Sequence, residues 1–264
     1  MTEQEAWRPP QPAAAEVLSP SQATQFLQCP AKWYFRYFLD LPEPVTAATA
    51  LGKALHETIA CNFRQKIQTN ADLPIGDSLE HFRSSLGRHL ETTALQRGIQ
   101  PMELMDLGSL MLEKYMCEVA PLVRPAAVET RVAGNIGGVK VRGYVDLLDV
   151  EGRIIDTKSA LKSIKGVSHD HRLQLTSYTM ITPQASGLCR LDTVTKELTI
   201  RLSQKSFRVE AADRRYVETI YPMVQESIRE GIFLPRRSSG LCSRKYCGYW
   251  YLCEREFGGV VRDE

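Results

Sequence analysis

The order of helical and β-rich segments predicts an α/β protein with a mixed central β-sheet flanked by helices. Helical patterns occupy most of the first 120 residues, and a glycine-punctuated β-rich stretch begins near residue 128. Beyond that stretch, helix and strand patterns alternate. The composition, with 43% hydrophobic and 24% charged residues among 264, is that of an ordinary globular protein with a substantial core.

The N-terminal region divides into a tail and a series of helices. We expect a flexible tail over residues 1–17, where three prolines prevent a long helix, and a single domain over 18–264. Ser19 can cap a first helix, which should end at Cys29 because this residue precedes a proline. The helices expected next cover 31–38, 47–66 and, as a helical insertion broken near residue 98, 67–122.

The β-rich stretch has the pattern of an antiparallel meander, because short apolar runs alternate with turns that contain glycine. One helix, two strands and a long helix should follow it. In chain order, the predicted elements are strands over 128–132, 139–150 and 153–157, a helix over 170–181, strands near 188–194 and 198–202, and a helix over 211–230.

Acidic and basic residues gather on two neighbouring strands of the meander. Asp156 and Lys158 should project to the same side, because residues i and i+2 of a strand do so. Asp146 would arrive from the adjacent strand. Two carboxylates at close range repel, and a divalent cation such as Mg²⁺ or Mn²⁺ relieves that repulsion. Such an ion and a nearby lysine are suited to phosphodiester hydrolysis.

An Asp-x-Lys pair alone is more often a surface ion pair, but three further motifs accompany it. Together they resemble the motif series of the RecB-like branch of the PD-(D/E)xK nuclease superfamily. The motifs, in chain order, are Gly52-Lys53-Ala54-Leu55-His56-Glu57, Gly143-Tyr144-Val145-Asp146, Asp156-Thr157-Lys158 and Gln174-Leu175-Thr176-Ser177-Tyr178.

The resemblance implies a restriction-endonuclease-like core and a metal-dependent DNA exonuclease, acting on single-stranded ends. It implies metal binding by the side chains of three residues and by one main-chain carbonyl. It also implies catalytic roles for a lysine, a glutamine and a tyrosine. The metal-binding residues would be His56, Asp146, Asp156 and, through its carbonyl, Thr157, and the catalytic ones Lys158, Gln174 and Tyr178.

The seven cysteines fall into two groups by context. Cys61, Cys117 and Cys189 stand singly among apolar neighbours and are expected to be buried packing residues. The other four divide into one near the N-terminus and three near the C-terminus. A site of four thiolates suits either zinc or an iron–sulfur cluster, and spacing does not separate the two cleanly. These four residues are Cys29, Cys242, Cys247 and Cys253.

The one-plus-three arrangement resembles the cluster-binding subset of RecB-like nucleases, which includes the CRISPR-associated adaptation nucleases. The resemblance implies a 4Fe–4S cluster held by a region made of residues 18–40 and 236–257. One departure stands out: four residues separate Cys242 and Cys247, where the family pattern has two. Unligated cysteines are the alternative.

The partners follow from the nuclease interpretation rather than from total charge, since the net charge is only +2. Basic residues cluster near the C-terminus, and basic and aromatic residues mix over 32–37, which suits phosphates and stacked bases but also an ordinary surface above buried aromatics. With no signal-peptide pattern and no apolar run long enough to span a membrane, we expect a cytoplasmic protein without membrane contact.

Two biological settings fit the resemblance. In CRISPR spacer acquisition the protein would trim prespacers alongside an integrase complex, and in recombination or repair it would act on DNA ends, with a helicase as a candidate partner. The alternative from another class is a non-catalytic DNA-binding or scaffold module of a nuclease–integrase complex. Such a module would be marked by degraded motifs, and the six side chains of the nuclease motifs are all present.

Overall fold

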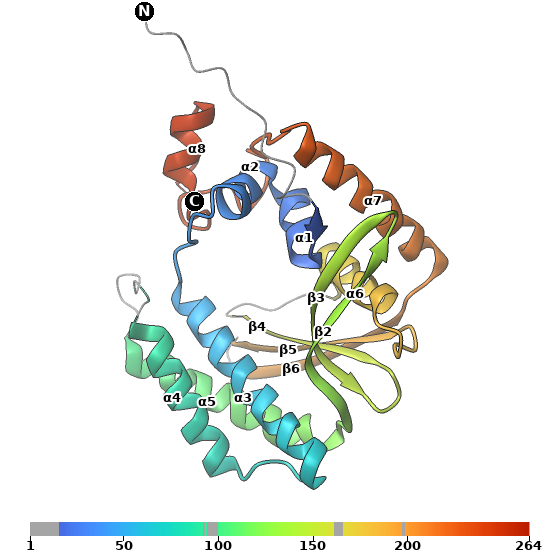
Figure 1. Cartoon of the computed structure of the whole chain (residues 1–264). Coiled ribbons are helices and arrows are strands. Elements are labelled where there is room, and N and C mark those ends of the chain that lie inside the picture. Colours follow the sequence, from blue (N-terminus) through green and yellow to red (C-terminus); the bar gives the residue numbers. More distant parts are fainter. Residues whose placement is uncertain (1–15, 92, 94–99, 161–165, 197–198, 264) are drawn as a thin grey trace, which may run out of the picture. The chain divides into compact units, whose positions relative to one another are not determined.

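The computed structural model describes residues 16–91, 93, 100–160, 166–196 and 199–263 (Figure 1). Nearly all of the predicted tail over residues 1–17 lies outside them. The chain divides into two compact units: the first consists of residues 1–43, 133–142 and 212–264, and the second of 44–132 and 143–211. No helix in the described part of the chain has the length and apolar character needed to cross a membrane.

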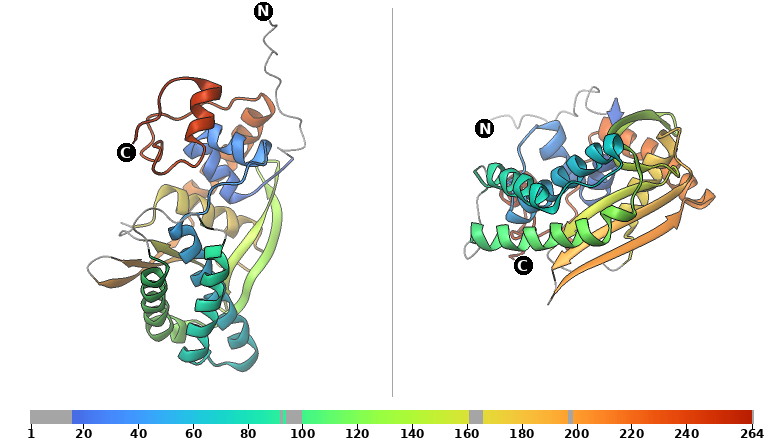
Figure 2. Two further views of the ribbon diagram at one scale, coloured as in Figure 1. Left: turned by 90° about the vertical axis from the view of Figure 1, so that its left-hand side faces the viewer. Right: turned by 90° about the horizontal axis from the view of Figure 1, so that it is seen from below.

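The second unit begins with three helices, α3 (Ala47–Thr69), α4 (Ile75–Glu91) and α5 (Pro101–Glu118). Their helical character was predicted from the spacing of apolar residues. Thr46 caps α3 by accepting a hydrogen bond from the main chain of Thr49. The helices pack on one another and on the sheet (Figure 2). Large, fully buried side chains form the core between them. These include Phe63, Phe82, Leu86, Leu112 and Tyr115.

Six strands form one mixed sheet in the order β1-β3-β4-β5-β6, with β2 paired to β3. The pairings of β1 with β3 and β4 with β5 are parallel, and those of β3 with β4 and β5 with β6 are antiparallel. The mixed α/β architecture is therefore the predicted one. The strands are β1 (Val17–Leu18), β2 (Pro125–Ile136), β3 (Val139–Asp149), β4 (Ile154–Ala160), β5 (Leu188–Lys196) and β6 (Ile200–Arg208).

A crossover helix makes the parallel pairing of β4 and β5 possible, because parallel neighbours cannot be joined by a tight turn. This helix is α6 (His169–Ile181), in agreement with the helix predicted over 170–181. The hydroxyl of Ser168 caps it by accepting from the main chain of His171. Helix α6 packs on β4 and β5 through a buried face that includes Leu173 and Tyr178.

The first unit holds the helices from both ends of the chain. Helix α1 (Pro20–Gln28) is capped by Ser19 and ends before Cys29, as predicted. The expected helix over 31–38 is present in two parts, α2 (Pro30–Trp33) and the π-helix η2 (Tyr34–Phe38). The C-terminal helices are α7 (Ala211–Arg229), which was predicted, and α8 (Trp250–Phe257), which was not.

The basic and aromatic stretch over 32–37 is largely committed to packing inside the first unit. Trp33 is fully buried and stacks on Phe233 with ring centroids 5.8 Å apart. Lys32 and Arg36 both form ion pairs with Glu43. Trp33 and Phe35 therefore belong to the core of this unit, whereas Tyr34 and Tyr37 are half-buried.

Candidate active site and cysteine site

The two predicted carboxylates meet where β3 and β4 run side by side in the second unit. The antiparallel register pairs Leu147 with Ile155, and one step further along it places Asp146 opposite Asp156. Asp156 is only 3% exposed. Burial, with the carboxylate of Asp146 nearby, raises the pKa of Asp156 from 3.8 to about 6, although Lys158 opposes the shift.

Lys158 projects from β4 on the same side as Asp156, as their i, i+2 spacing predicts. Its Nζ donates to Asp156 Oδ1 at 2.8 Å. Burial alone would lower the pKa of Lys158, but the carboxylates of Asp156 and Asp146 outweigh it, and the pKa is raised. The lysine therefore remains an ammonium group that is held against the paired carboxylates.

Helix α3 brings His56 to the same place. Its Nε2 lies 2.9 Å from Asp146 Oδ2. This hydrogen bond is the main cause that raises the pKa of His56, and it outweighs the burial of the ring. The same contact is one of the causes that lower the pKa of Asp146 against the effect of its burial.

Gln174 and Tyr178 lie one helical turn apart on α6, the helix that packs on β4 and β5. Tyr178 is buried, which raises its pKa, and the charges of Asp146 and Asp156 raise it further. Gln174 hydrogen-bonds the tyrosine and opposes that shift. The structure thus gathers the side chains of all the predicted catalytic and acidic residues at one site.

Thr157 stands between Asp156 and Lys158 and turns its side chain to the other face of the sheet. Its Oγ1 lies 3.5 Å from the hydroxyl of the buried Tyr115. Thr157 also helps to line a cavity of about 10 Å³ together with His56 and Asp146. This volume approaches the room that one water molecule needs.

The donor set fits a hard divalent cation. Asp156 Oδ2 is buried without a hydrogen-bond partner among the described residues, and a cation shared with Asp146 would satisfy it. In the part of the chain that the structure describes, no three His, Cys, Asp or Glu side chains are arranged as a ready metal site. His56 and Lys158 instead engage the carboxylates directly.

Sequence reasoning missed Glu129 and Arg64, which extend this site. Glu129 Oε1 lies 3.4 Å from His56 Nδ1, and its second oxygen pairs with Nη2 of Arg64. Glu129 stands in β2 among residues whose pattern is that of an ordinary strand. Nothing in the local pattern distinguishes it from a solvent-facing glutamate.

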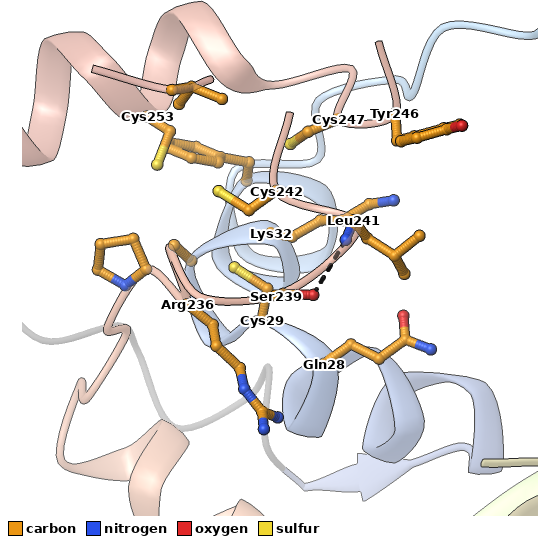
Figure 3. Close-up of a pocket in the computed structure, with 14 residues that line it drawn as sticks. Gln28, Cys29, Lys32, Arg236, Ser239, Leu241, Cys242, Tyr246, Cys247 and Cys253 are labelled. Atoms are coloured by element: carbon orange, nitrogen blue, oxygen red, sulfur yellow. Dashed lines mark hydrogen bonds between the residues drawn. The ribbon is translucent and has the colours of Figure 1, made fainter. Parts of the chain in front are cut away.

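The four cysteines set apart by their spacing surround one cavity in the first unit, with a volume of about 180 Å³ (Figure 3). Burial raises the pKa of Cys247, and it raises that of Cys253 to about 11. In both cases the neighbouring thiols add to the shift, so the four sulfurs lie within electrostatic reach of one another. A backbone hydrogen bond from Tyr249 and the charge of Lys32 oppose this rise in the pKa of Cys247.

Hydrogen bonds inside the first unit hold the cysteine-bearing segments. Arg236 donates to the carbonyl of Leu27 at 2.8 Å, and the hydroxyl of Tyr249 donates to the carbonyl of Leu41 at 2.7 Å. The main-chain N–H of Cys247 donates to the carbonyl of Ser243 at 2.8 Å. The turn accommodates the four residues between Cys242 and Cys247, and Cys247 still lines the cavity.

The expectation for the other three cysteines is partly wrong. Cys189 is buried as predicted, but Cys61 is half-buried and Cys117 is exposed. Cys117 lies in the last turn of α5, whose outer face also exposes Met102 and Leu110. Apolar neighbours in the sequence therefore did not mark a buried position on this helix.

The mixed sheet, with helices on its faces and with paired carboxylates and a lysine on neighbouring strands, is the arrangement that the motif series led us to expect. The match of a family model over residues 17–254 agrees: this chain belongs to the PD-(D/E)XK nuclease superfamily. Members of this superfamily typically use Mg²⁺ or Mn²⁺. Membership supports a nuclease of the hydrolase class, which would bind DNA.

One solved structure agrees on the fold. A protein of Eubacterium rectale with the provisional assignment of an exonuclease aligns over 89% of this chain and 88% of that chain, with a TM-score of 0.56 and 12% identity. The crystal structure of SSO0001 aligns over 87% of this chain and 95% of that chain at 16% identity, with a TM-score of only 0.38. No curated protein matches the sequence.

Proposed function

We propose that this protein is a metal-dependent DNA exonuclease that acts on single-stranded ends and carries a structural 4Fe–4S cluster. The observation that carries the nuclease proposal is the meeting of Asp146, Asp156 and Lys158 at one point of the sheet, with His56 beside them. Both carboxylates are mostly buried, so a cation there would replace an electrostatic penalty with a favourable interaction.

We assign the cation to His56, Asp146, Asp156 and the carbonyl of Thr157. When bound, Mg²⁺ or Mn²⁺ polarises the scissile phosphate and lowers the pKa of a water molecule. Lys158 keeps its proton because the carboxylates raise its pKa. Its ammonium group, anchored on Asp156, is placed to orient the attacking water and to stabilise the negative charge that develops on the phosphate oxygens.

Gln174 and Tyr178 line the other side of the same site. The hydroxyl of Tyr178 keeps its proton at neutral pH, because burial and the carboxylates raise its pKa. It can therefore donate a hydrogen bond to a phosphate oxygen, and Gln174 fixes the direction of that hydroxyl. Both residues are assigned to substrate positioning.

Lys158→Ala is expected to lower the degradation of end-labelled single-stranded DNA in Mn²⁺ by roughly 100-fold or more, the loss typical for a group that stabilises developing charge. Lys114→Ala is a matched control, because Lys114 forms an exposed ion pair on α5 and should leave the rate unchanged. Equal degradation by wild type and Lys158→Ala would contradict the catalytic assignment. Rapid cleavage of circular single strands would contradict exonuclease action.

The cluster proposal is supported by four thiols around one cavity, with Lys32 and Arg236 also in its lining. Protein purified without oxygen is expected to be brown, with the broad visible absorption of a 4Fe–4S centre and about four irons per chain. Stoichiometric zinc in a colourless protein would replace the cluster with a structural zinc site. Cys117→Ser, a change at an exposed cysteine outside the cavity, should leave iron content unchanged.

The cellular setting that we propose is the cytoplasmic processing of DNA ends, either as prespacer trimming beside a CRISPR integrase complex or in recombination and repair with a helicase. An integrase gene next to this one would favour the first. The non-catalytic scaffold alternative is disfavoured by the intact set of buried acidic and basic groups at the site. Turnover by the wild-type protein would exclude it.

A further inference from the structure

The main chain of Glu129 has a conformation that glutamate rarely adopts. Its φ is 45°, and the only other non-glycine residues with positive φ in the described part of the chain are Asp40 and Asn70. Short polar side chains such as those of Asp and Asn tolerate the left-handed region, whereas a longer side chain inside a strand does not gain from it. A backbone conformation of this kind persists only where the surrounding contacts hold it.

The side chain of Glu129 makes two contacts, both to helix α3. One oxygen lies 3.4 Å from Nδ1 of His56, and the other pairs with Nη2 of Arg64. His56 and Arg64 are two helical turns apart, so they lie on the same face of α3. The opposite nitrogen of the imidazole, Nε2, lies 2.9 Å from Asp146. The ring therefore stands between two carboxylates.

We propose that Glu129 is a positioning residue for the metal centre, which fixes the ring of His56 through Nδ1 and leaves Nε2 for the cation. The inference rests on the proposed metal-dependent function. Histidines that bind metals commonly donate their second ring N–H to a carboxylate, which selects the tautomer, orients the ring and raises its basicity as a ligand. Arg64 holds the carboxylate of Glu129 in the direction that this contact requires.

An ordinary ion pair between Glu129 and Arg64 does not account for these observations. Both side chains are partly exposed, Glu129 at 34% and Arg64 at 53%, and such pairs contribute little to stability. A surface pair would also have no need of a left-handed main chain. The conformation instead turns the carboxylate towards the ring of His56, where it has a function beyond packing.

The test is the affinity of the protein for Mn²⁺ in the absence of DNA. It is measured from the loss of the free Mn²⁺ signal in electron paramagnetic resonance as the ion binds. Glu129→Gln and Glu129→Ala are expected to weaken Mn²⁺ binding about 10- to 100-fold, the range typical for partners of a metal-binding histidine. In activity assays excess Mn²⁺ should restore kcat, because Glu129 itself does not touch the substrate. Glu118→Gln, an exposed glutamate that pairs with Lys114, should bind Mn²⁺ as wild type does.

Glu129→Gly separates positioning from folding. Glycine adopts positive φ without cost, so this variant should melt at a higher temperature than Glu129→Ala while binding Mn²⁺ equally weakly. Wild-type affinity within threefold in Glu129→Gln and Glu129→Gly, or a loss of activity that excess Mn²⁺ does not restore, would overturn the inference. Wild-type protein that neither binds Mn²⁺ nor degrades DNA would instead overturn the proposed function.

Discussion

Asp156→Asn is expected to abolish DNA degradation and, at the same time, to stabilise the metal-free protein at neutral pH. Activity should fall by roughly 1,000-fold, because the substitution removes both a proposed charged ligand of the cation and the anchor of Lys158. The stability gain follows from removing a fully buried carboxylate that faces a second one. The folded protein holds this group in an unfavourable state when no cation is bound.

The raised pKa of Asp156 determines how the stability of the metal-free protein changes with pH. The pKa of Asp156 is about 6 in the folded protein and 3.8 ordinarily, so the folded state binds the proton more tightly than the unfolded state. The contribution of this group to stability is complete below about pH 4 and is lost as the pH rises through about 6. The loss amounts to about 3 kcal/mol at most, because each tenfold difference in proton affinity between the two states corresponds to about 1.4 kcal/mol.

Thermal melting in EDTA between pH 4 and pH 7.5 measures this effect. The melting temperature of the wild-type protein should fall towards pH 7 relative to that of Asp156→Asn, and saturating Mn²⁺ should reverse the difference. Asp106→Asn, a change at an exposed position on α5, serves as the matched control and should follow the wild-type curve. Parallel pH profiles for wild type and Asp156→Asn would show that Asp156 is ionised without penalty in the folded protein.

If the proposed cluster is bound, Cys29→Ser is expected to destabilise the protein more than any other substitution considered. Cys29 is the only one of the four cysteines that comes from the N-terminal part of the chain, and its removal opens a closed loop of more than two hundred residues. Loop-closure entropy alone predicts a loss of about 5 kcal/mol, reduced by whatever structure the unfolded chain retains.

The measurement is the melting temperature of anaerobically purified protein, together with its iron content. Cys29→Ser should lose iron and melt several degrees lower, while Cys117→Ser should do neither. An unchanged melting temperature for an iron-loaded wild type and an iron-free Cys29→Ser protein would mean that the cluster does not link the two ends of the chain. The residual contacts between Arg236 and Leu27 would then carry that connection.

Most of the fold could be predicted because its signals are local. Ser19 and Cys29-Pro30 mark the two ends of α1, and a run of apolar residues at helical spacing marks α3. The two-residue strand β1 could not be predicted, since its only distinguishing property is its pairing with a strand more than a hundred residues away. The exposure of Cys117 likewise depends on which face of α5 meets the core.

The candidate site divides in the same way. Asp156 and Lys158 were predicted to project together because strand geometry requires it, and the resemblance to RecB-like nucleases implied that His56 joins them. Glu129 could not be found, because its contact with His56 depends on a left-handed main chain inside β2 that no residue type in that segment announces. The roles of all these residues in catalysis stay predictions.

The positions of the four cysteines in the sequence also determine when, during synthesis, all four thiols are first present. At a synthesis rate of about 5–20 residues per second, Cys29 is added to the growing chain roughly 10–40 s before Cys242. During that interval its thiol has no partner from the C-terminal segment and is open to oxidants and to competing metals. A cluster at this cavity would therefore be delivered after translation, and cells with weakened iron–sulfur assembly should accumulate a chain that lacks the cluster.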